Sequence, residues 1–466
     1  MTTLIPKYSQ GAAGAVNRPI NQKFAECVSV KDFGAIGDGV ADDTSAMQSA
    51  HNTGNIIYYP AGTYNFTKIT MTSGGIKGDG QTLTKLVSTN NDTSDIIGWV
   101  GAGQSSYNGT SNGPLFERFT LSALTTKTGG GSLSLAPSIG EVSFATLLDI
   151  TFQGGYIGFN TVAASHWNIS RCNFINYYYS GVLVQNTNNN DSGDSTIEQC
   201  TFNMGIAGSV VNAGVRQISS GGLRIVNCKF LGGAYGYKMD AVLSKNVADL
   251  LIVGCSIENQ SLAGIQFNKT SGAYSWGSIV ISSNEFGNIP LMIIANDASN
   301  FLSDIIIVGN TFSQILSGQV GVTFDYNQDI YISSNKFSGS GTSTGISIGT
   351  NTIAAKIGDN LFRSIQFKFV NASSTTKICS GTQQSGTAIV VTNAVYGTFY
   401  NGNTTITFPI AYYAAPSVTA AIVDGAAGGI SVLVGFTSAT QVVLTVIGIT
   451  NGASVNIKWS AIGYGE

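Results

Sequence analysis

One short pattern of apolar and polar residues repeats along the middle of this 466-residue chain. Each copy has an Ile, then a Cys or Asn three residues later, then a Phe (once an Ile) two residues after that. The eight copies begin at Ile169, Ile197, Ile225, Ile252, Ile281, Ile307, Ile332 and Ile357. They recur every 25 to 29 residues, and a fixed period of this length is typical of a solenoid in which each repeat forms one coil.

The Ile of most copies is preceded, two positions earlier, by another apolar residue, as in Leu250–Ile252 and Ile305–Ile307. This alternation predicts a strand with one buried face. A second short strand follows each copy and often opens with Gly, as at Gly264. Two or three strands per coil without helical periodicity predict a parallel β-solenoid, in which equal residues stack from coil to coil.

The Cys or Asn of each copy is expected at a bend between strands. Four of the six cysteines occupy this position in consecutive coils, namely Cys172, Cys200, Cys228 and Cys255. We expect a ladder of buried thiols there, rather than a metal site or disulfides, because free Cys packs as a small apolar residue. The Asn of the next four coils could bond the backbone of a neighbouring coil, as in the Asn ladders of stacked strands.

Composition narrows the possible partners. The chain has 58 Gly, 8 Pro and only 10% charged residues, which fits many tight turns and a neutral polar surface. Its net charge of −3, without a basic run, argues against nucleic acid as a partner. We find no apolar run long enough for a membrane span and no signal peptide at the N-terminus.

Three regions are expected along the chain. Residues 1–30 read as an extended arm, and residues 31–372 as the solenoid, with one helix at 44–52 near its start and Asp42 or Asp43 as the N-cap. Beyond residue 372 the period is lost. About six strands separated by turn signals predict a small β-sandwich within residues 373–466.

Three motifs near the N-terminus carry a family resemblance. VKDFGAIGDGVADDT (residues 30–44), YYPAGTY (58–64) and IKGDG (76–80) occur in that order. They resemble the N-terminal part of pectate-lyase-like right-handed β-helix proteins, and more narrowly bacteriophage tailspikes and capsule depolymerases. In that family the motifs build the cap and the first coils. Asp38, Asp42 and Asp43 are therefore expected to be structural rather than metal ligands.

The end of the chain carries a second resemblance. Residues Trp459–Tyr464 within IKWSAIGYGE resemble the closing strand of lectin-like C-terminal domains of phage tail fibres. Together the resemblances imply an all-β homotrimer on the virion, acting outside the host cell. The N-terminal arm would attach it to the phage tail or an adaptor protein. The spike would bind and cleave a bacterial surface polysaccharide, capsule or O-antigen. We expect no cofactor, and no spacing of His, Cys or Asp indicates a metal site.

Strand register gives the candidate binding residues. Counted from the opening Gly, the second and fourth residues of the second strands should face outward. This outer set comprises Arg216, Lys238, Asp240, Gln266, Asn268, Ile293, Ala295, Thr323 and Asp325. In a charge-poor chain it indicates a sugar-binding face, although a solvated strand face is the alternative. Tyr274 and Trp276, in a nearby loop, could stack on sugar rings or simply pack the loop.

Three functions stay open at this point. Asp297 and Asp325 are one coil and about two residues apart, hence about 8 Å, within the range of roughly 6.5–9.5 Å used for inverting hydrolysis. This pair is the preferred catalytic hypothesis. Arg216, Lys238 and Asp240 could instead neutralise a uronate and remove its C5 proton, as a lyase does. A receptor-binding spike without catalysis is the third reading. His51 and His166 lack any catalytic motif and are expected to be structural or surface residues.

Overall fold

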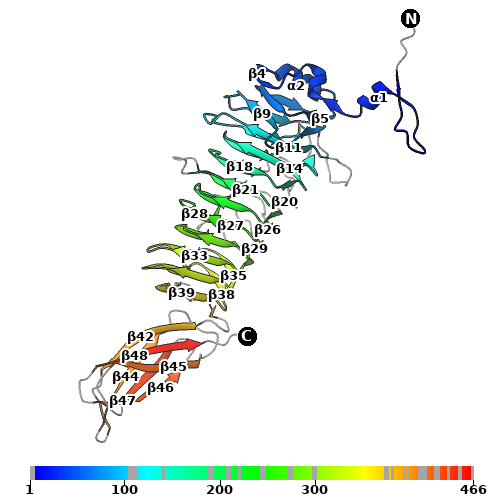
Figure 1. The fold of residues 1–466 in the computed structure, drawn as a ribbon. Helices are drawn as coiled ribbons and strands as arrows, with labels where there is room; N and C mark the ends of the chain where they lie inside the picture. Colours follow the sequence, from blue (N-terminus) through cyan, green and yellow to red (C-terminus); the bar gives the residue numbers. More distant parts are fainter. Residues whose placement is uncertain are drawn as a thin grey trace. The chain divides into compact units, whose positions relative to one another are not determined.

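The computed structural model describes the strands of every repeat and part of the chain between them. The described residues are 6–102, 113–138, 142–162, 164–185, 194–205, 211–218, 222–241, 248–269, 277–295, 302–371, 377–378, 383–391, 394–396, 399–407, 417–424, 431–437, 441–449 and 454–462. They fall into two compact units, residues 1–243 and residues 244–466 (Figure 1).

The first unit is capped at its N-terminal end by helix α2 (Thr44–His51), which confirms the predicted helix. The Asp43 side chain does not cap α2. Its carboxylate instead accepts the backbone N–H groups of Ile36 and Gly37 at 2.7 and 3.1 Å. Asp42 accepts the Thr44 N–H at 2.9 Å and so satisfies the first turn. Both carboxylates are therefore structural, as expected. The arm before the cap holds β1 (Lys7–Tyr8), β2 (Arg18–Pro19) and the short helix α1 (Ile20–Phe24).

Parallel strands stack coil on coil through the rest of the first unit. One sheet runs in the order β7 (Ile69–Met71), β10 (Ile97–Trp99), β12 (Gly131–Leu135), β15 (Ile157–Thr161), β19 (Ser180–Gln185), β22 (Ala213–Ile218) and β25 (Tyr235–Ala241). The other side of the coils includes β8 (Gly75–Gly78), β11 (Leu115–Ser122), β14 (Thr146–Gln153), β17 (Asn168–Ser170), β18 (Asn173–Ile175), β20 (Ser195–Glu198), β21 (Thr201–Asn203), β23 (Leu223–Val226) and β24 (Lys229–Leu231). Every described pairing among these strands is parallel, which confirms the predicted β-solenoid.

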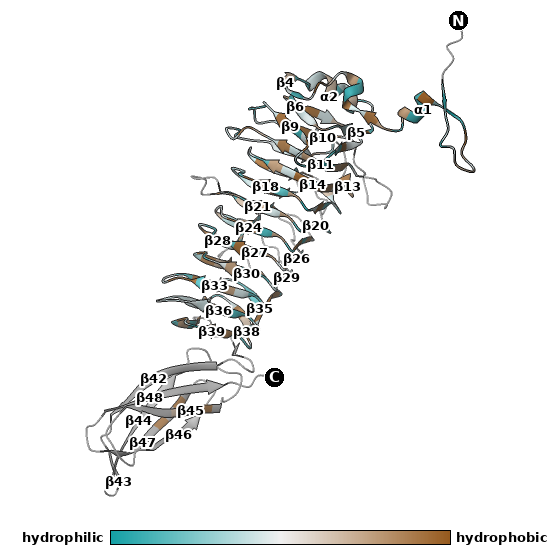
Figure 2. Ribbon diagram, in the orientation of Figure 1, coloured by the Kyte–Doolittle hydropathy of each residue, from teal (hydrophilic) through white to brown (hydrophobic). Residues whose placement is uncertain are grey.

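The second unit continues the same coil plan. One sheet has the order β28 (Ala263–Lys269), β31 (Leu291–Ala295), β34 (Val320–Phe324), β37 (Thr344–Ile348) and β40 (Phe367–Asn371). Opposite it lie β26 (Ala248–Val253), β27 (Ser256–Glu258), β29 (Gly277–Ser282), β30 (Glu285–Gly287), β32 (Ile305–Val308), β33 (Thr311–Ile315), β35 (Gln328–Ser333), β36 (Lys336–Gly339), β38 (Ile353–Ile357) and β39 (Leu361–Arg363). Apolar residues recur in strand after strand of both units (Figure 2).

Equal residues form ladders in the core of the coils. Rings of successive coils stack at 4.9 and 4.6 Å in the series Phe286, Phe312 and Phe337. Asn284, Asn310, Asn335 and Asn360 form the predicted asparagine ladder. In it each Asn side chain accepts the backbone N–H of the preceding coil, as the Oδ1 of Asn310 does from Asn284 at 2.9 Å. The repeated Ile–Asn–Phe pattern therefore places both the stacked apolar residues of the core and the hydrogen bonds at each bend.

The C-terminal strands are antiparallel. β42 (Gln383–Val391), β48 (Ser454–Ile462) and β45 (Ser417–Asp424) form one sheet, with β48 in the middle. The other sheet has the order β43 (Ala394–Tyr396), β44 (Phe399–Thr407), β47 (Gln441–Ile449) and β46 (Ser431–Thr437). The sandwich packing of the two sheets and the boundaries after residues 30 and 372 stay predictions. Both described α-helices are too short to cross a membrane.

Candidate functional site

The outer face of the β22–β25 sheet carries the best-defined cluster of charged side chains. Arg216 on β22 pairs in register with Lys238 on β25. Successive strand residues point to opposite faces, so these two side chains lie on the side away from the buried Val215. The guanidinium of Arg216 forms an ion pair with Asp240 through Nη1 and donates to the Val211 carbonyl through Nη2. Lys238 Nζ lies 3.2 Å from the other Asp240 oxygen.

Tyrosines flank both cations of this cluster. The Arg216 guanidinium lies 4.3 Å from the ring centroid of Tyr179, and Lys238 Nζ lies 4.7 Å from that of Tyr235. Such cation–π contacts restrain both cations. Tyr156 stacks on Tyr179 with centroids 5.2 Å apart and an interplanar angle of 7°. Burial raises the pKa values of Tyr156 and Tyr235 above their usual range, so both rings keep their hydroxyl protons at neutral pH.

Exposure divides the roles within the cluster. The Arg216 side chain is 4% exposed, whereas Lys238 and Asp240 are each 14% exposed. Arg216 is thus held by Tyr179, Val211 and Asp240 and positions the carboxylate. Lys238 and Asp240 retain an accessible edge. Two cations around one carboxylate give the cluster a net positive charge, which suits an anionic group on a ligand.

The predicted outward orientation is right for most residues of the outer set and wrong for one coil. In the second unit Gln266 pairs with Ile294 and Ile294 with Thr323, so these residues share the outer column. Ile293 and Ala295 were expected in it, but they point into the core and are 0% and 2% exposed. The error arises because β31 has no opening Gly. Leu291 pairs with Ala263, the residue before Gly264, and so shifts the count by one.

Asp325 lies directly after β34 and holds a turn of the next coil. One carboxylate oxygen accepts the backbone N–H groups of Tyr326 and Asn351 at 3.0 and 2.9 Å. A side chain on Gly349 would meet this carboxylate at 2.2 Å, so Gly349 makes the contact possible. The suggested partner Asp297 lies outside the described residues, and the Asp297–Asp325 pair stays a prediction.

The remaining predicted ligands are only partly described. Gln266 and Asn268 are half-buried on β28. Within the described part of the chain, the buried Oε1 of Gln266 accepts no hydrogen bond. Tyr274 and Trp276 lie outside the described residues.

Sequence reasoning missed the tyrosines beside the charged cluster. Tyr178 and Tyr179 end a run of three tyrosines immediately before β19, and Tyr156 occupies the matching place one coil earlier. The usable signal was the position of aromatic residues just before the second strand of a coil, a place where loops meet the sheet.

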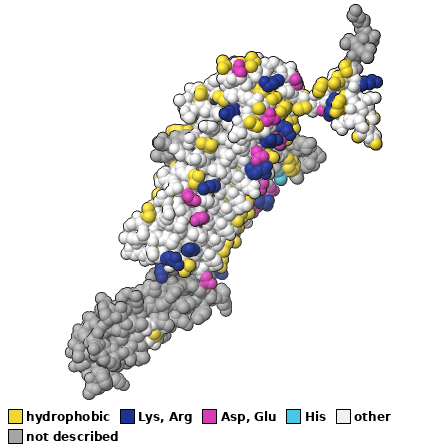
Figure 3. Space-filling model, viewed as in Figure 1, with side chains coloured by type: hydrophobic (Ala, Val, Ile, Leu, Met, Phe, Trp, Pro, Cys, Tyr) yellow, Lys and Arg dark blue, Asp and Glu magenta, His cyan; other side chains and the backbone are white. Residues whose placement is uncertain are grey.

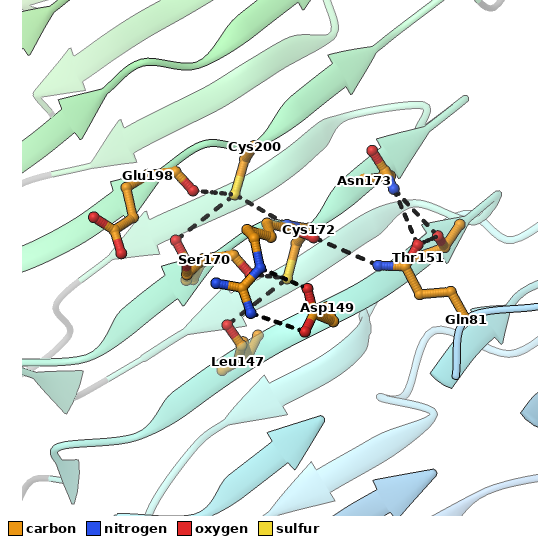
Figure 4. A network of polar contacts seen from close by, with 11 residues as sticks. Gln81, Leu147, Asp149, Thr151, Ser170, Cys172, Asn173, Glu198 and Cys200 are labelled. Atoms are coloured by element: carbon orange, nitrogen blue, oxygen red, sulfur yellow. Dashed lines mark hydrogen bonds and ion pairs between the residues drawn. The ribbon is translucent and has the colours of Figure 1, made fainter. Parts of the chain in front are cut away.

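Other polar groups brace the coils (Figure 4). Arg171 and Asp149 of adjacent coils form a bidentate pair at 2.8 and 2.9 Å. The Gln81 side chain, from a turn near the cap, accepts from Thr151 and Asn173 of two further coils.

The cysteines of the ladder are structural as well. Cys172, Cys200, Cys228 and Cys255 are buried and form no disulfide, which confirms the thiol ladder. The Sγ of Cys200 accepts the backbone N–H of Cys172 at 3.4 Å and donates to the Glu198 carbonyl at 3.2 Å. Within the described ranges no group of three or more His, Cys, Asp or Glu side chains is placed to hold a metal ion.

Both histidines are placed as structural or surface residues. His51 is buried in the cap, where its Nε2 lies 3.0 Å from the Tyr59 hydroxyl. His166 lies against the Phe144 ring, with its Nε2 3.7 Å from Asp194.

Comparison with known proteins adds the family context. Residues 27–98 match the family model described as rhamnogalacturonase A/epimerase, pectate lyase-like. The tail spike protein of an Escherichia phage is 38% identical over 63 residues, which are 14% of this chain and 8% of that protein. The chain thus matches only a small part of this relative's length.

Solved structures resemble the chain over a far greater length. The A-module of mannuronan C-5 epimerase AlgE6 from Azotobacter vinelandii superposes with a TM-score of 0.59 at 15% identity, over 76% of this chain and 98% of the module. The tailspike protein of E. coli bacteriophage HK620, solved with a pentasaccharide, gives a TM-score of 0.51 at 14% identity, over 98% and 97% of the two chains. The chain is therefore a right-handed parallel β-helix protein with a pectate-lyase-like N-terminal segment.

Proposed function

We propose that this protein is a phage tailspike that binds a bacterial surface polysaccharide, capsule or O-antigen, and degrades it. The charged cluster of Arg216, Lys238 and Asp240 beside Tyr179 and Tyr235 carries the proposal, because it is a fixed polar site on the outer face of a β-helix. The match to the Escherichia phage tail spike and the fold shared with the HK620 tailspike support the virion context.

The charge of the cluster points to an acidic sugar unit. Among the residues that Figure 3 colours by type, the visible surface is mostly uncharged, with charged side chains in small separate groups. Against this background, two cations beside one carboxylate favour a ligand that brings its own carboxylate, such as a uronate. Lys238, the more accessible cation, would pair with that carboxylate, and the neighbouring Tyr235 ring would border the sugar.

Hydrolysis is the preferred chemistry. One oxygen of the Asp325 carboxylate accepts two backbone N–H hydrogen bonds, which hold the side chain in place to act as a general base. Asp325 would take a proton from water as the water attacks the anomeric carbon. Asp297 would protonate the leaving glycosidic oxygen, so that one bond forms and one breaks.

β-Elimination is the second candidate, and the geometry around Asp240 favours it. With Lys238 pairing the uronate carboxylate, the C5 proton becomes more acidic and passes to Asp240. The C4–O bond breaks, the leaving oxygen takes up this proton from Asp240, and a C4–C5 double bond forms. The product is an unsaturated uronate that absorbs ultraviolet light.

Product analysis separates these functions. Purified protein is incubated with capsule and O-polysaccharides of candidate hosts, and chain length, reducing ends and ultraviolet absorbance are read together. Asp325→Asn and Asp240→Asn are compared with Asp359→Asn, an exposed turn residue that serves as the matched control. New reducing ends without absorbance, lost in Asp325→Asn, support hydrolysis. Absorbing products, lost in Asp240→Asn, support elimination. Binding without shortening overturns the degradative function and leaves a receptor-binding spike.

Assembly belongs to the same proposal. We expect a homotrimer, attached to the phage tail or an adaptor protein through residues 1–30, with the C-terminal strands as a trimerisation or glycan-binding tip. Light scattering of the full chain, and of the chain lacking residues 373–466, measures the mass of each. A monomeric full chain contradicts the trimer. An unchanged trimer in the shortened chain contradicts the role of the C-terminal strands in assembly.

A further inference from the structure

A hollow of about 340 Å³ opens on the outer surface of the second unit beside β27, β30 and β33. We propose that it is a second saccharide site, which takes a neutral sugar unit through its hydroxyl groups. The inference rests on the proposed function, because it assigns a further part of the same polysaccharide to the spike. Its residues are separate from the charged cluster around Asp240.

A missing side chain creates the hollow. Gly287 on β30 pairs in register with Glu258 on β27 and with Ser313 on β33. A Cβ atom on Gly287 would lie 3.5 Å from the Ser313 hydroxyl oxygen and 3.7 Å from Cγ of Glu258, which is ordinary contact. The glycine is not required by a left-handed backbone, since its φ lies outside that region. The glycine leaves space between the side chains of Glu258 and Ser313, which lie in the coils on either side of it.

Two carboxylates border this space. Glu285 lies two residues before Gly287 on the same face of β30, and Glu258 lies one coil away. Coils about 4.8 Å apart and same-face residues about 6.7 Å apart put their Cα atoms about 8 Å from each other. Ser256 donates a hydrogen bond to Glu258 and so fixes one of the two carboxylates.

Amides form the corner of the hollow. Asn259 and Asn288 both have left-handed backbones, with φ values of 64° and 55°, and the Asn288 amide donates to the Asn259 side chain at 2.8 Å. The two side chains are tied together at the edge of the hollow and are exposed. They offer donors and acceptors that are already oriented, which lowers the entropic cost of binding.

The chemistry of the lining selects the ligand class. The described residues around the hollow supply two carboxylates, three amides and one hydroxyl, with no basic side chain among them. Sugar hydroxyls are hydrogen-bond donors that carboxylates accept well. An acidic sugar would be repelled here, in contrast to the cluster around Lys238. The volume lies at the small end of ligand pockets and suits one or two sugar rings.

Filling the hollow tests the inference. Gly287→Val adds two methyl groups where a Cβ atom already fits. Gly277→Val is the matched control, because its Cβ would also meet nothing closer than 3.4 Å, on another strand of the same unit. Saturation-transfer NMR on the full protein uses glucose, galactose, mannose, rhamnose and N-acetylglucosamine as neutral probes. Glucuronate and galacturonate are the acidic probes.

The expected result is saturation transfer to at least one neutral sugar that falls at least fivefold in Gly287→Val, Glu258→Gln and Glu285→Gln and persists in Gly277→Val. Transfer to uronates should survive these changes and fall in Lys238→Met, which tests the proposed function separately. The inference is overturned if no neutral sugar shows transfer, or if Gly287→Val leaves the transfer unchanged. It is also overturned if Glu258→Gln or Glu285→Gln abolishes polysaccharide cleavage but keeps neutral-sugar binding, because the pair would then be catalytic.

Discussion

Single amides hold the bends of the second unit together. The Asn310 side chain accepts from both the backbone and the side chain of Asn284, at 2.9 and 3.0 Å. It donates in turn to the Ile281 carbonyl and to Asn335. Asn310 is 1% exposed, so water does not replace these partners. Loss of the Asn310 side chain would therefore leave several buried hydrogen-bonding groups of neighbouring coils unpaired.

Asn310→Ala should destabilise its coil by about 2–4 kcal/mol, because the Asn284 donors lose their acceptor inside the core. Hydrogen exchange at the Asn284 and Asn310 amides, followed by mass spectrometry, measures the loss of protection. The exposed amide Gln153 gives the control, and Gln153→Ala should stay within about 0.5 kcal/mol. Equal protection in both variants would mean that the ladder contributes nothing to stability.

His51 makes the cap sensitive to acid. Burial lowers the pKa of its imidazole to about 4, against a usual value of 6.5. Below pH 6.5 the unfolded chain binds a proton that the folded cap does not. The free energy of unfolding therefore falls as the pH drops towards 4, by up to about 1.4 kcal/mol per pH unit.

The pH dependence can be measured as hydrogen exchange of the α2 amides between pH 7 and pH 4, corrected for intrinsic exchange rates. We expect His51→Gln to flatten the profile and His166→Gln to leave it steep. A wild-type cap as stable at pH 4.5 as at pH 7 would show that His51 does not govern acid stability.

At the level of strands and ladders, cysteine and asparagine make different contacts at the same bend. Cys200 accepts the backbone N–H of Cys172 through sulfur at 3.4 Å, where Asn310 uses oxygen at 2.9 Å. Burial raises the pKa of the Cys200 thiol well above its usual range, which keeps it protonated and inert. The Cys half of the ladder thus resembles apolar packing more than a hydrogen-bonded brace.

Thiol labelling should distinguish the ladder from the exposed cysteine. In a Cys379→Ser background, native protein should react quickly with an aromatic disulfide reagent at Cys27 alone. Cys172, Cys200, Cys228 and Cys255 should react only after unfolding. Fast labelling of more than one thiol in the folded protein would show that the ladder opens to solvent.

The elements differ in how far the sequence determined them. The Ile–Asn–Phe spacing was sufficient to predict the stacked strands, because each coil repeats the same burial pattern. The count from the opening glycine failed at Ile293 and Ala295, where that glycine is absent and register depends on the neighbouring coil. The link between Arg216, Lys238 and Asp240 followed from register. Their tyrosine neighbours and the hollow at Gly287 did not, because side-chain packing across coils leaves no periodic signal.

For the whole molecule, charge predicts how binding responds to salt. The chain has a net charge of −3, whereas the cluster around Lys238 is locally positive. An acidic polysaccharide should therefore bind several-fold more weakly when ionic strength rises about tenfold, because salt screens the partly exposed Lys238. Binding measured by isothermal calorimetry should lose this dependence in Lys238→Met. A neutral polysaccharide that binds equally well at all salt concentrations would contradict the acidic ligand.

The asparagine ladder also makes the number of coils adjustable. Each Asn bonds an identical Asn in the next coil, so a junction is the same wherever it occurs between Asn284 and Asn360. Removing residues 311–335, one complete period, would bring Asn310 onto Asn360 with the same partners, in line with the nearest-neighbour energetics of repeat proteins. Duplicating that segment would extend the solenoid by one step. Evolution can therefore change the reach of such a protein by copying coils, without redesigning its core.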